Sequence, residues 1–133
     1  MEKVELFSFE KHEGPYENWP PLSRLYFNNR LTSVSLGGYA ILAQLKFEHG
    51  YIIVTDYDCP FEEMTTFYYL GNDLEIIDSR QFGAPYESFL LDKIEPIGPA
   101  TLRFNFYGSK QFELTVLNKP EFFSRSFFEV KVT

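Results

Sequence analysis

Alternation of apolar and polar residues is most regular between residues 39 and 57. Apolar side chains occupy every second position on both sides of the tripeptide Glu48-His49-Gly50. A period of two is typical of a β-strand with one buried face, so the pattern predicts a β-hairpin over Tyr39–Tyr57. Pairing Phe47 with Tyr51 leaves a three-residue loop in which Gly50 takes a left-handed conformation. The residues expected to be buried on the apolar face are Ile41, Leu45, Phe47 and Ile53.

Two further hairpins are predicted from the same period. The segment Met64–Phe82 reverses at a Gly-Asn-Asp tripeptide, and the segment Thr101–Leu117 reverses at Gly108-Ser109-Lys110. In the latter, a three-residue loop pairs Phe106 with Phe112, whereas a two-residue loop would place polar residues opposite the phenylalanines. The three-residue loop is therefore expected.

The rest of the chain contains shorter apolar stretches separated by Gly, Pro and Asn. One helix is expected at Pro21–Asn29, because proline suits a first helical position and Leu22, Leu25 and Tyr26 fall on one helical stripe. A further turn is expected to start at Pro120. Single strands are expected at Lys3–Glu10, Ser33–Leu36, Ser88–Glu95 and Phe127–Val132.

These elements define the expected fold class. About ten short strands with frequent turns predict an all-β protein, either an antiparallel β-sandwich or a closed barrel, with one or two short helical turns. Composition agrees, because the chain has 15 Phe and 9 Tyr and aromatic residues favour strands. A length of 133 residues suits one core, so residues 1–133 are expected to form a single β domain.

Acidic residues are concentrated in the middle of the chain. The net charge is −7, and the segment Glu48–Glu95 contains eleven acids against two bases. A surface of this kind repels polyanions. Neither nucleic acid nor an anionic membrane is therefore expected as a partner.

Residues suited to catalysis are few. His12 lies between Glu10 and Glu13, where a carboxylate would orient it as a general base, but no motif places a nucleophile beside it. Cys59 follows Asp58, whose negative charge disfavours the reactive thiolate. The sequence has no glycine-rich loop of the kind that binds phosphate. We therefore expect a protein that is not an enzyme and has no cofactor.

The single cysteine and the first residues bear on location. One cysteine excludes an intrachain disulfide and a cysteine zinc cluster. The segment Met1–Glu5 lacks the basic start and apolar run of a secretory leader. A cytoplasmic protein is expected.

Four carboxylates stand within the eight residues Asp56–Glu63. Calcium is one interpretation, but an EF-hand loop needs a further ligand and a glycine where this sequence has Cys59-Pro60-Phe61, so no metal is expected. The other interpretations are a solvated acidic rim and a protein interface, in which aromatic side chains anchor a partner among the charges. The residues expected to bind a partner are Asp56, Tyr57, Asp58, Phe61, Glu62, Glu63, Tyr69, Asp73 and Glu75.

A small acidic β domain without a catalytic constellation resembles the immunity proteins of bacterial toxin–immunity pairs, such as those of contact-dependent growth inhibition systems. The resemblance rests on size, on the acidic segment Glu48–Glu95 and on the run Asp56–Glu63. It implies a cytosolic inhibitor whose partner is a basic toxin domain, such as a nuclease, and which occludes that domain with its acidic face. The alternative function is a β-barrel or sandwich that binds a small apolar or sugar ligand in an aromatic-lined pocket.

Overall fold

The computed structural model describes residues 1–58, 64–83 and 89–133 of the chain. In these ranges it contains twelve β-strands and one 3₁₀ turn (η1, Tyr16–Asn18), so the predicted all-β class is confirmed. The strands are β1 (Glu2–Lys3), β2 (Phe7–Phe9), β3 (Leu22–Phe27), β4 (Arg30–Gly37), β5 (Ala40–Phe47), β6 (Gly50–Asp56), β7 (Thr65–Gly71), β8 (Ile76–Phe82), β9 (Leu91–Pro96), β10 (Thr101–Phe106), β11 (Gln111–Val116) and β12 (Phe128–Val132).

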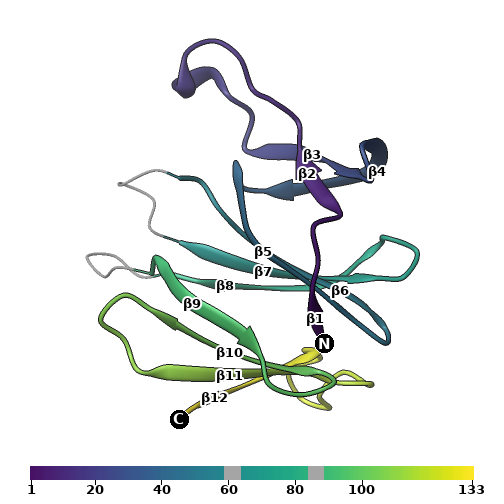
Figure 1. Cartoon of the computed structure of the whole chain (residues 1–133), viewed down its shortest axis with the longest axis vertical. Helices are drawn as coiled ribbons and strands as arrows, with labels where there is room; N and C mark the ends of the chain where they lie inside the picture. The colour runs from purple at the N-terminus through teal and green to yellow at the C-terminus, as the bar shows by residue number, and fades with distance from the viewer. Residues whose placement is uncertain (59–63, 84–88) are drawn as a thin grey trace.

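The strands form three antiparallel sheets stacked as layers (Figure 1). A five-stranded sheet with the order β1-β5-β6-β7-β8 lies in the middle. The four-stranded sheet β12-β11-β10-β9 packs against one of its faces, and the three-stranded sheet β2-β3-β4 packs against the other. None of these sheets closes on itself within the described residues. The structure is therefore a sandwich, and the alternative of a closed barrel is wrong.

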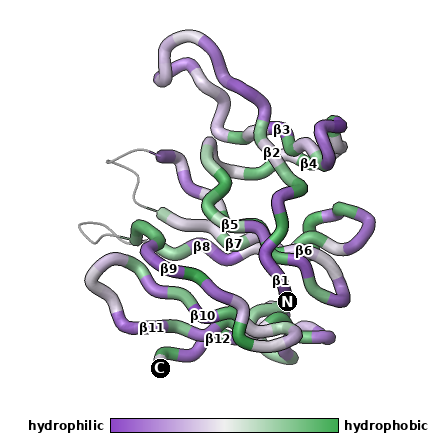
Figure 2. Tube along the Cα trace, viewed as in Figure 1, coloured by the Kyte–Doolittle hydropathy of each residue, from purple (hydrophilic) through white to green (hydrophobic). Residues whose placement is uncertain are grey.

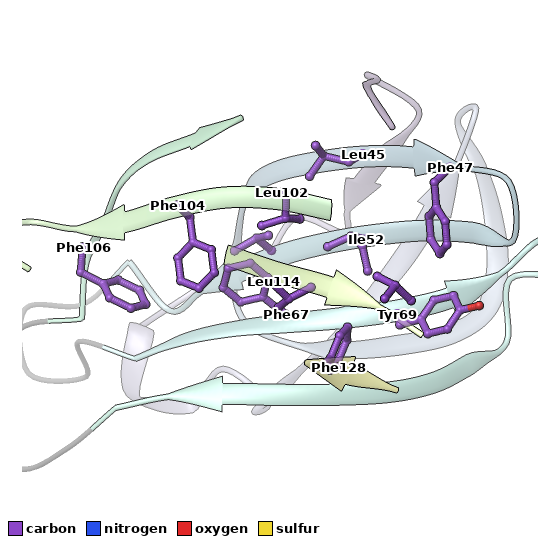
Figure 3. Close-up of a cluster of buried hydrophobic side chains, with 12 residues drawn as sticks. Leu45, Phe47, Ile52, Phe67, Tyr69, Leu102, Phe104, Phe106, Leu114 and Phe128 are labelled. Atoms are coloured by element: carbon purple, nitrogen blue, oxygen red, sulfur yellow. The ribbon is translucent and has the colours of Figure 1, made fainter. Parts of the chain in front are cut away.

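The larger core fills the space between the five-stranded and four-stranded sheets (Figure 3). Phe67 of β7 reaches across this space, and its ring centroid lies 4.7 Å from that of Phe104. Phe82 packs against the same two rings, with centroids 5.4 and 5.5 Å away. The buried residues of this core are Leu45, Phe47, Ile52, Val54, Phe67, Tyr69, Leu102, Phe104, Phe106, Leu114, Val116 and Phe128.

A smaller core lies between the five-stranded and three-stranded sheets. Strand β6 contributes to both cores, because Ile52 and Val54 belong to the larger core whereas Tyr51 and Ile53 belong to the smaller one. Every residue of β6 is consequently buried. The buried residues of the smaller core are Phe7, Leu25, Leu36, Tyr51, Ile53 and Leu70.

The β5–β6 hairpin forms as predicted, but its register differs by one residue. Phe47 pairs with Gly50 and not with Tyr51, and Leu45 pairs with Ile52. A slip of one residue reverses which face each side chain takes, so Tyr51 faces the smaller core. Gly50 has φ +155°, which is not the predicted left-handed turn conformation but is still a positive value that favours glycine.

Three of the four residues predicted to be buried on this hairpin are buried, namely Leu45, Phe47 and Ile53. Ile41 is only partly buried. A β-bulge between Ile41 and Ala43 shifts the register there. Ile41 consequently packs against the smaller core, whereas Ala43 packs against the larger one.

The β10–β11 hairpin also differs in register from the prediction. Phe104 pairs with Phe112, and Leu102 pairs with Leu114. The predicted partner of Phe112 was Phe106, so the shift is two residues. Because side chains alternate with a period of two, this shift keeps the apolar residues on the predicted face.

The helix predicted at Pro21–Asn29 is wrong, because this segment forms strand β3. Strand β3 is the middle strand of its sheet and pairs with both β2 and β4. Its residues Ser23 and Leu25 are fully buried at a spacing of two. Backbone pairing on both sides and burial of one face outweigh the weak helical stripe.

The predicted strand Lys3–Glu10 is in fact two strands, β1 and β2, in different sheets. The side chain of Gln44 in β5 hydrogen-bonds to the backbone where the chain passes from β1 to β2. Its amide oxygen accepts hydrogen bonds from the backbone N–H groups of Leu6 (2.9 Å) and Phe7 (2.8 Å). Its amide nitrogen donates to the carbonyl oxygen of Phe7 (2.8 Å). These bonds fix β2 and so position the residues after it, which carry part of the candidate site.

Candidate functional site: an aromatic cluster beside exposed acids

Five aromatic rings from the β2–β3 loop, from the residue before β5 and from the residue after β6 lie close together. Figure 1 shows the backbone of the β2–β3 loop. Tyr39 lies at the centre, with its ring centroid 4.9 to 5.5 Å from those of the other four. His12 is largely covered, whereas the other four residues keep part of their surface exposed. We call this group the aromatic cluster, and its members are His12, Tyr16, Trp19, Tyr39 and Tyr57.

Polar atoms of the cluster bond to the backbone of the β2–β3 loop, whose trace is mostly hydrophilic or neutral (Figure 2). The Tyr39 and Tyr57 hydroxyls donate to the carbonyl oxygens of Pro20 and Pro21, at 2.8 and 3.0 Å respectively. The Trp19 indole N–H donates to the carbonyl oxygen of Gly14 (3.1 Å). The loop is thus fastened to the sheets. Rings held in this way lose little conformational freedom on binding a partner.

His12 contacts a serine that the sequence analysis did not place near it. Its Nε2 lies 2.8 Å from Ser23 Oγ, and Ser23 Oγ donates to the carbonyl oxygen of Gly38 (2.5 Å). The Glu10 carboxylate lies 3.8 Å from Nδ1. The order Glu10, His12, Ser23 resembles a hydrolytic triad, but the serine proton is donated to Gly38, so Nε2 is the donor and not the base. Ser23 is also fully buried, and the bond therefore orients His12.

The structure describes only part of the acidic run Asp56–Glu63, which begins at the end of β6. Tyr57 belongs to the aromatic cluster, and Asp58 next to it is exposed. Asp56 is 9% exposed, and its Oδ1 accepts a hydrogen bond from the backbone N–H of Asp58 (3.0 Å). Burial raises the pKa of the Asp56 carboxyl, although that hydrogen bond acts in the opposite direction. The other predicted members of this run, Phe61, Glu62 and Glu63, lie outside the described residues.

The remaining predicted residues do not share a face with Asp58. Tyr69, which was expected to bind a partner, is 5% exposed and packs in the larger core against Phe47, so its ring is not accessible as an anchor. Asp73 and Glu75 are exposed, but they follow the far end of β7, the end that pairs with the start of β6. Seven extended residues separate the two ends by on the order of 20 Å. The predicted acidic face is therefore divided between opposite ends of the sheet.

Two acids that the sequence analysis did not assign to a binding site flank the aromatic cluster instead. Glu13 and Glu17 are exposed on the β2–β3 loop, next to His12 and Tyr16 respectively. They lie outside the acidic middle segment, so charge density along the chain gave no signal for them. Their link to Asp58 depends on the fold, which brings this loop to the end of β6.

A groove runs beside the cluster, between β2 with the residues that follow it and β5. Its volume is about 510 Å³, and it opens to the surface. The residues that line it are Phe7, Ser8, Phe9, Glu10, Lys11, His12, Trp19, Tyr39, Ile41 and Gln44.

A second exposed aromatic feature lies on the β11–β12 connection. The turn predicted at Pro120 is found at residues 122–124, and Phe122 and Phe123 on it are 87% and 88% exposed. The base of the connection is fastened to β8, because the backbone N–H of Phe127 donates to the Asp78 carboxylate (2.8 Å). In the sequence this pair of phenylalanines has one acidic neighbour, Glu121, whereas the aromatic cluster is flanked by Glu10, Glu13, Glu17 and Asp58.

Within the described ranges, no group of three or more His, Cys, Asp or Glu side chains is arranged to hold a metal ion. The same part of the chain contains no helix long and apolar enough to cross a membrane. No protein family, curated protein or solved structure matches the chain. Its function is therefore inferred from the site alone.

Replacing Asp56 by Asn is expected to stabilise the protein at neutral pH. The folded state raises the pKa of Asp56 above 3.8 through burial, so folding is favoured when this carboxyl is protonated, and that contribution is lost as the pH rises through the folded pKa. The asparagine side chain keeps an oxygen that accepts from the N–H of Asp58 and carries no charge. Urea unfolding should show the Asp56→Asn variant more stable than wild type at about pH 7, with the difference vanishing at about pH 3.

The matched control for this variant is Asp73→Asn, because Asp73 is exposed and its Oδ1 likewise accepts a hydrogen bond from the backbone N–H two residues later, that of Glu75 (3.2 Å). Its replacement removes the same charge without relieving a buried one, so it should change stability little at either pH. An Asp56→Asn variant less stable than wild type at neutral pH would contradict this account.

Proposed function

We propose that this protein is a non-catalytic binding module that recognises a basic protein through the aromatic cluster and the acids around it. The observation that carries the proposal is the gathering of five rings, four of them partly exposed, beside an exposed carboxylate at one end of the sheet. Tyr and Trp are enriched among the residues that contribute most to protein interfaces. Tyr16, at 42% exposure, is the most accessible of these rings.

Electrostatics favours a basic partner. The chain carries a net charge of −7. Around the cluster, the described acids Glu10, Glu13, Glu17 and Asp58 outnumber the bases Lys11 and Arg24. Long-range attraction raises the rate of encounter with a cationic surface, whereas a few anchoring side chains supply most of the affinity.

The biological role that we propose is that of a cytosolic immunity protein. A domain of this size and acidity that binds a basic toxin, such as a nuclease, inhibits it when the bound face covers the toxin's active site or substrate groove. This proposal is tested by co-purification with the product of the adjacent gene, followed by an activity assay of that product with and without this protein. The proposal is overturned if the product of the adjacent gene neither binds this protein nor loses activity in its presence.

The two parts of the interface should have different kinetic signatures. Changing Glu13, Glu17 and Asp58 together to Gln, Gln and Asn should mainly slow association and weaken its dependence on salt. Tyr16→Ala should mainly speed dissociation and weaken binding by about 2 kcal/mol. Surface plasmon resonance at two salt concentrations separates these effects, and Tyr107→Ala is the control.

Tyr107 is a matched control because it is 61% exposed and follows β10 in the four-stranded sheet, away from the cluster. Its replacement should leave both rates unchanged. Binding that is equally tight and equally salt-dependent after the triple charge replacement would rule out the electrostatic model. If Tyr16→Ala and Tyr107→Ala reduce the affinity for the partner equally, the cluster is ruled out as the binding face.

A further inference from the structure

The groove beside the aromatic cluster is open to the surface and large enough to hold a small molecule. Its volume of about 510 Å³ falls within the range of roughly 300–1,000 Å³ that is usual for ligand pockets. One wall comes from β2 and the residues after it, which the Gln44 amide holds in place. The other comes from Trp19, Tyr39 and β5. The site is therefore built from elements that are fixed in the fold.

The aromatic side chains that line the groove present apolar ring atoms to a ligand, because their polar atoms are hydrogen-bonded within the protein. The rings of Trp19 and Tyr39 are nearly perpendicular, at 85°, with centroids 5.1 Å apart. The ring of His12 lies at 31° to that of Trp19. The Trp19 N–H and the Tyr39 hydroxyl bond to backbone carbonyl oxygens inside the loop. Both residues line the groove, so a ligand there would contact aromatic side chains that these hydrogen bonds hold in place.

Polar groups of opposite charge complete the lining. Glu10 presents a hydrogen-bond acceptor, Lys11 a donor, and Ser8 both. The Gln44 amide is already used on the backbone of β2 and its neighbour. The groove therefore combines an apolar aromatic wall with donors and acceptors whose charges cancel.

This combination selects against charged and against purely apolar ligands. A cation is attracted over long range by the net charge of −7, but inside the groove it would meet Lys11 and, beside Glu10, Arg24. An anion would meet Glu10 and the net charge of −7. An apolar molecule would remove water from Glu10 and Lys11 without replacing the hydrogen bonds. A neutral ring with hydroxyl groups and one apolar face meets each of these demands, and we propose that the groove binds a sugar.

Trp19 makes this site directly observable, because it is the one tryptophan in the sequence. Titration of the purified protein with glucose, N-acetylglucosamine and maltose should give a saturable change in tryptophan fluorescence for at least one of them. The expected dissociation constant is on the order of 1 mM, as for a small ligand in an open site. Glu10→Gln and Lys11→Ala should each weaken binding by about tenfold, because each removes a charge-assisted hydrogen bond.

Lys110→Ala is the matched control, because Lys110 is an exposed lysine in the β10–β11 turn. It should leave the titration unchanged. The proposal is overturned by the lack of a saturable response to every sugar, by equal affinities of the Glu10, Lys11 and Lys110 variants, or by a response to arginine amide in place of sugars. The titration uses this protein alone, so its failure leaves the proposed protein interface standing, and failure of the partner assay leaves the sugar site standing.

Discussion

Gly50→Ala is expected to destabilise the protein by about 3–5 kcal/mol, because backbone strain and overpacking act together at this position. Gly50 has φ +155°, and a Cβ there would overlap the carbonyl oxygen of Leu70 and lie 3.0 Å from Cα of Gly71. Both neighbours are backbone atoms of β7, the strand that pairs with β6 on this side. Relief therefore requires the two central strands to move apart. Far-ultraviolet circular dichroism during urea unfolding measures the loss.

Two other glycines separate the causes of this effect. Gly108 also has a positive φ, +75°, but nothing lies within 4 Å of its added Cβ, so Gly108→Ala should show backbone strain alone, at about 1 kcal/mol. At Gly98 the added Cβ would make an ordinary contact, 3.7 Å from Cβ of Thr101. Gly98→Ala should change stability little. If the Gly50 variant is no less stable than the Gly108 variant, the close approach of β6 and β7 does not add to the cost of the substitution.

Phe67→Ala is expected to cost about 3–5 kcal/mol through the cavity that it leaves. Phe67 has no exposed surface and lies in the core between the two larger sheets (Figure 3). Its ring packs against those of Phe82 and Phe104. The loss is a large fraction of the usual stability of a small protein. The matched control is Phe122→Ala, since Phe122 is 87% exposed, and its replacement should stay within about 0.5 kcal/mol of wild type.

The Phe67→Ala variant also tests whether the three layers unfold together. Strand β6 lies in both cores, so a cavity on one of its faces should weaken the packing on the other. Fluorescence of Trp19, near the three-stranded sheet, should therefore change at the same urea concentration as the far-ultraviolet signal. Two separate transitions would show that the smaller core survives loss of the larger one.

The candidate site shows which of its residues could be predicted from the sequence. Tyr57 and Asp58 were predicted, because an aromatic residue among carboxylates at the end of a strand is a local feature. His12, Tyr16 and Trp19 were not assigned to a binding site, because they meet Tyr39 only after β2 and β3 have joined the three-stranded sheet. No spacing in the sequence marks that encounter.

In the acidic middle segment the sequence analysis grouped residues that the fold separates. Residues that are close in sequence were expected to share one face, but Asp58 and Asp73 lie at opposite ends of strands that run antiparallel. Tyr69 was expected to bind a partner but is buried, because the five-stranded sheet is covered on both faces. A strand pattern shows which residues alternate, and it does not show how many of its faces will be covered.

The sequence by itself determined the all-β class and the three hairpins, because a period of two and glycine-containing turns are local properties of strands. Tertiary structure decided the rest. Pairing on both sides converted the segment 21–29 from an expected helix to strand β3. The two-residue turn before Gly50 and the bulge after Ile41 set the register. The pairing of β3 with β2 and the packing of the β5–β6 hairpin on both faces depend on contacts between residues far apart in the chain. The energies of these contacts exceed the small differences in local propensity.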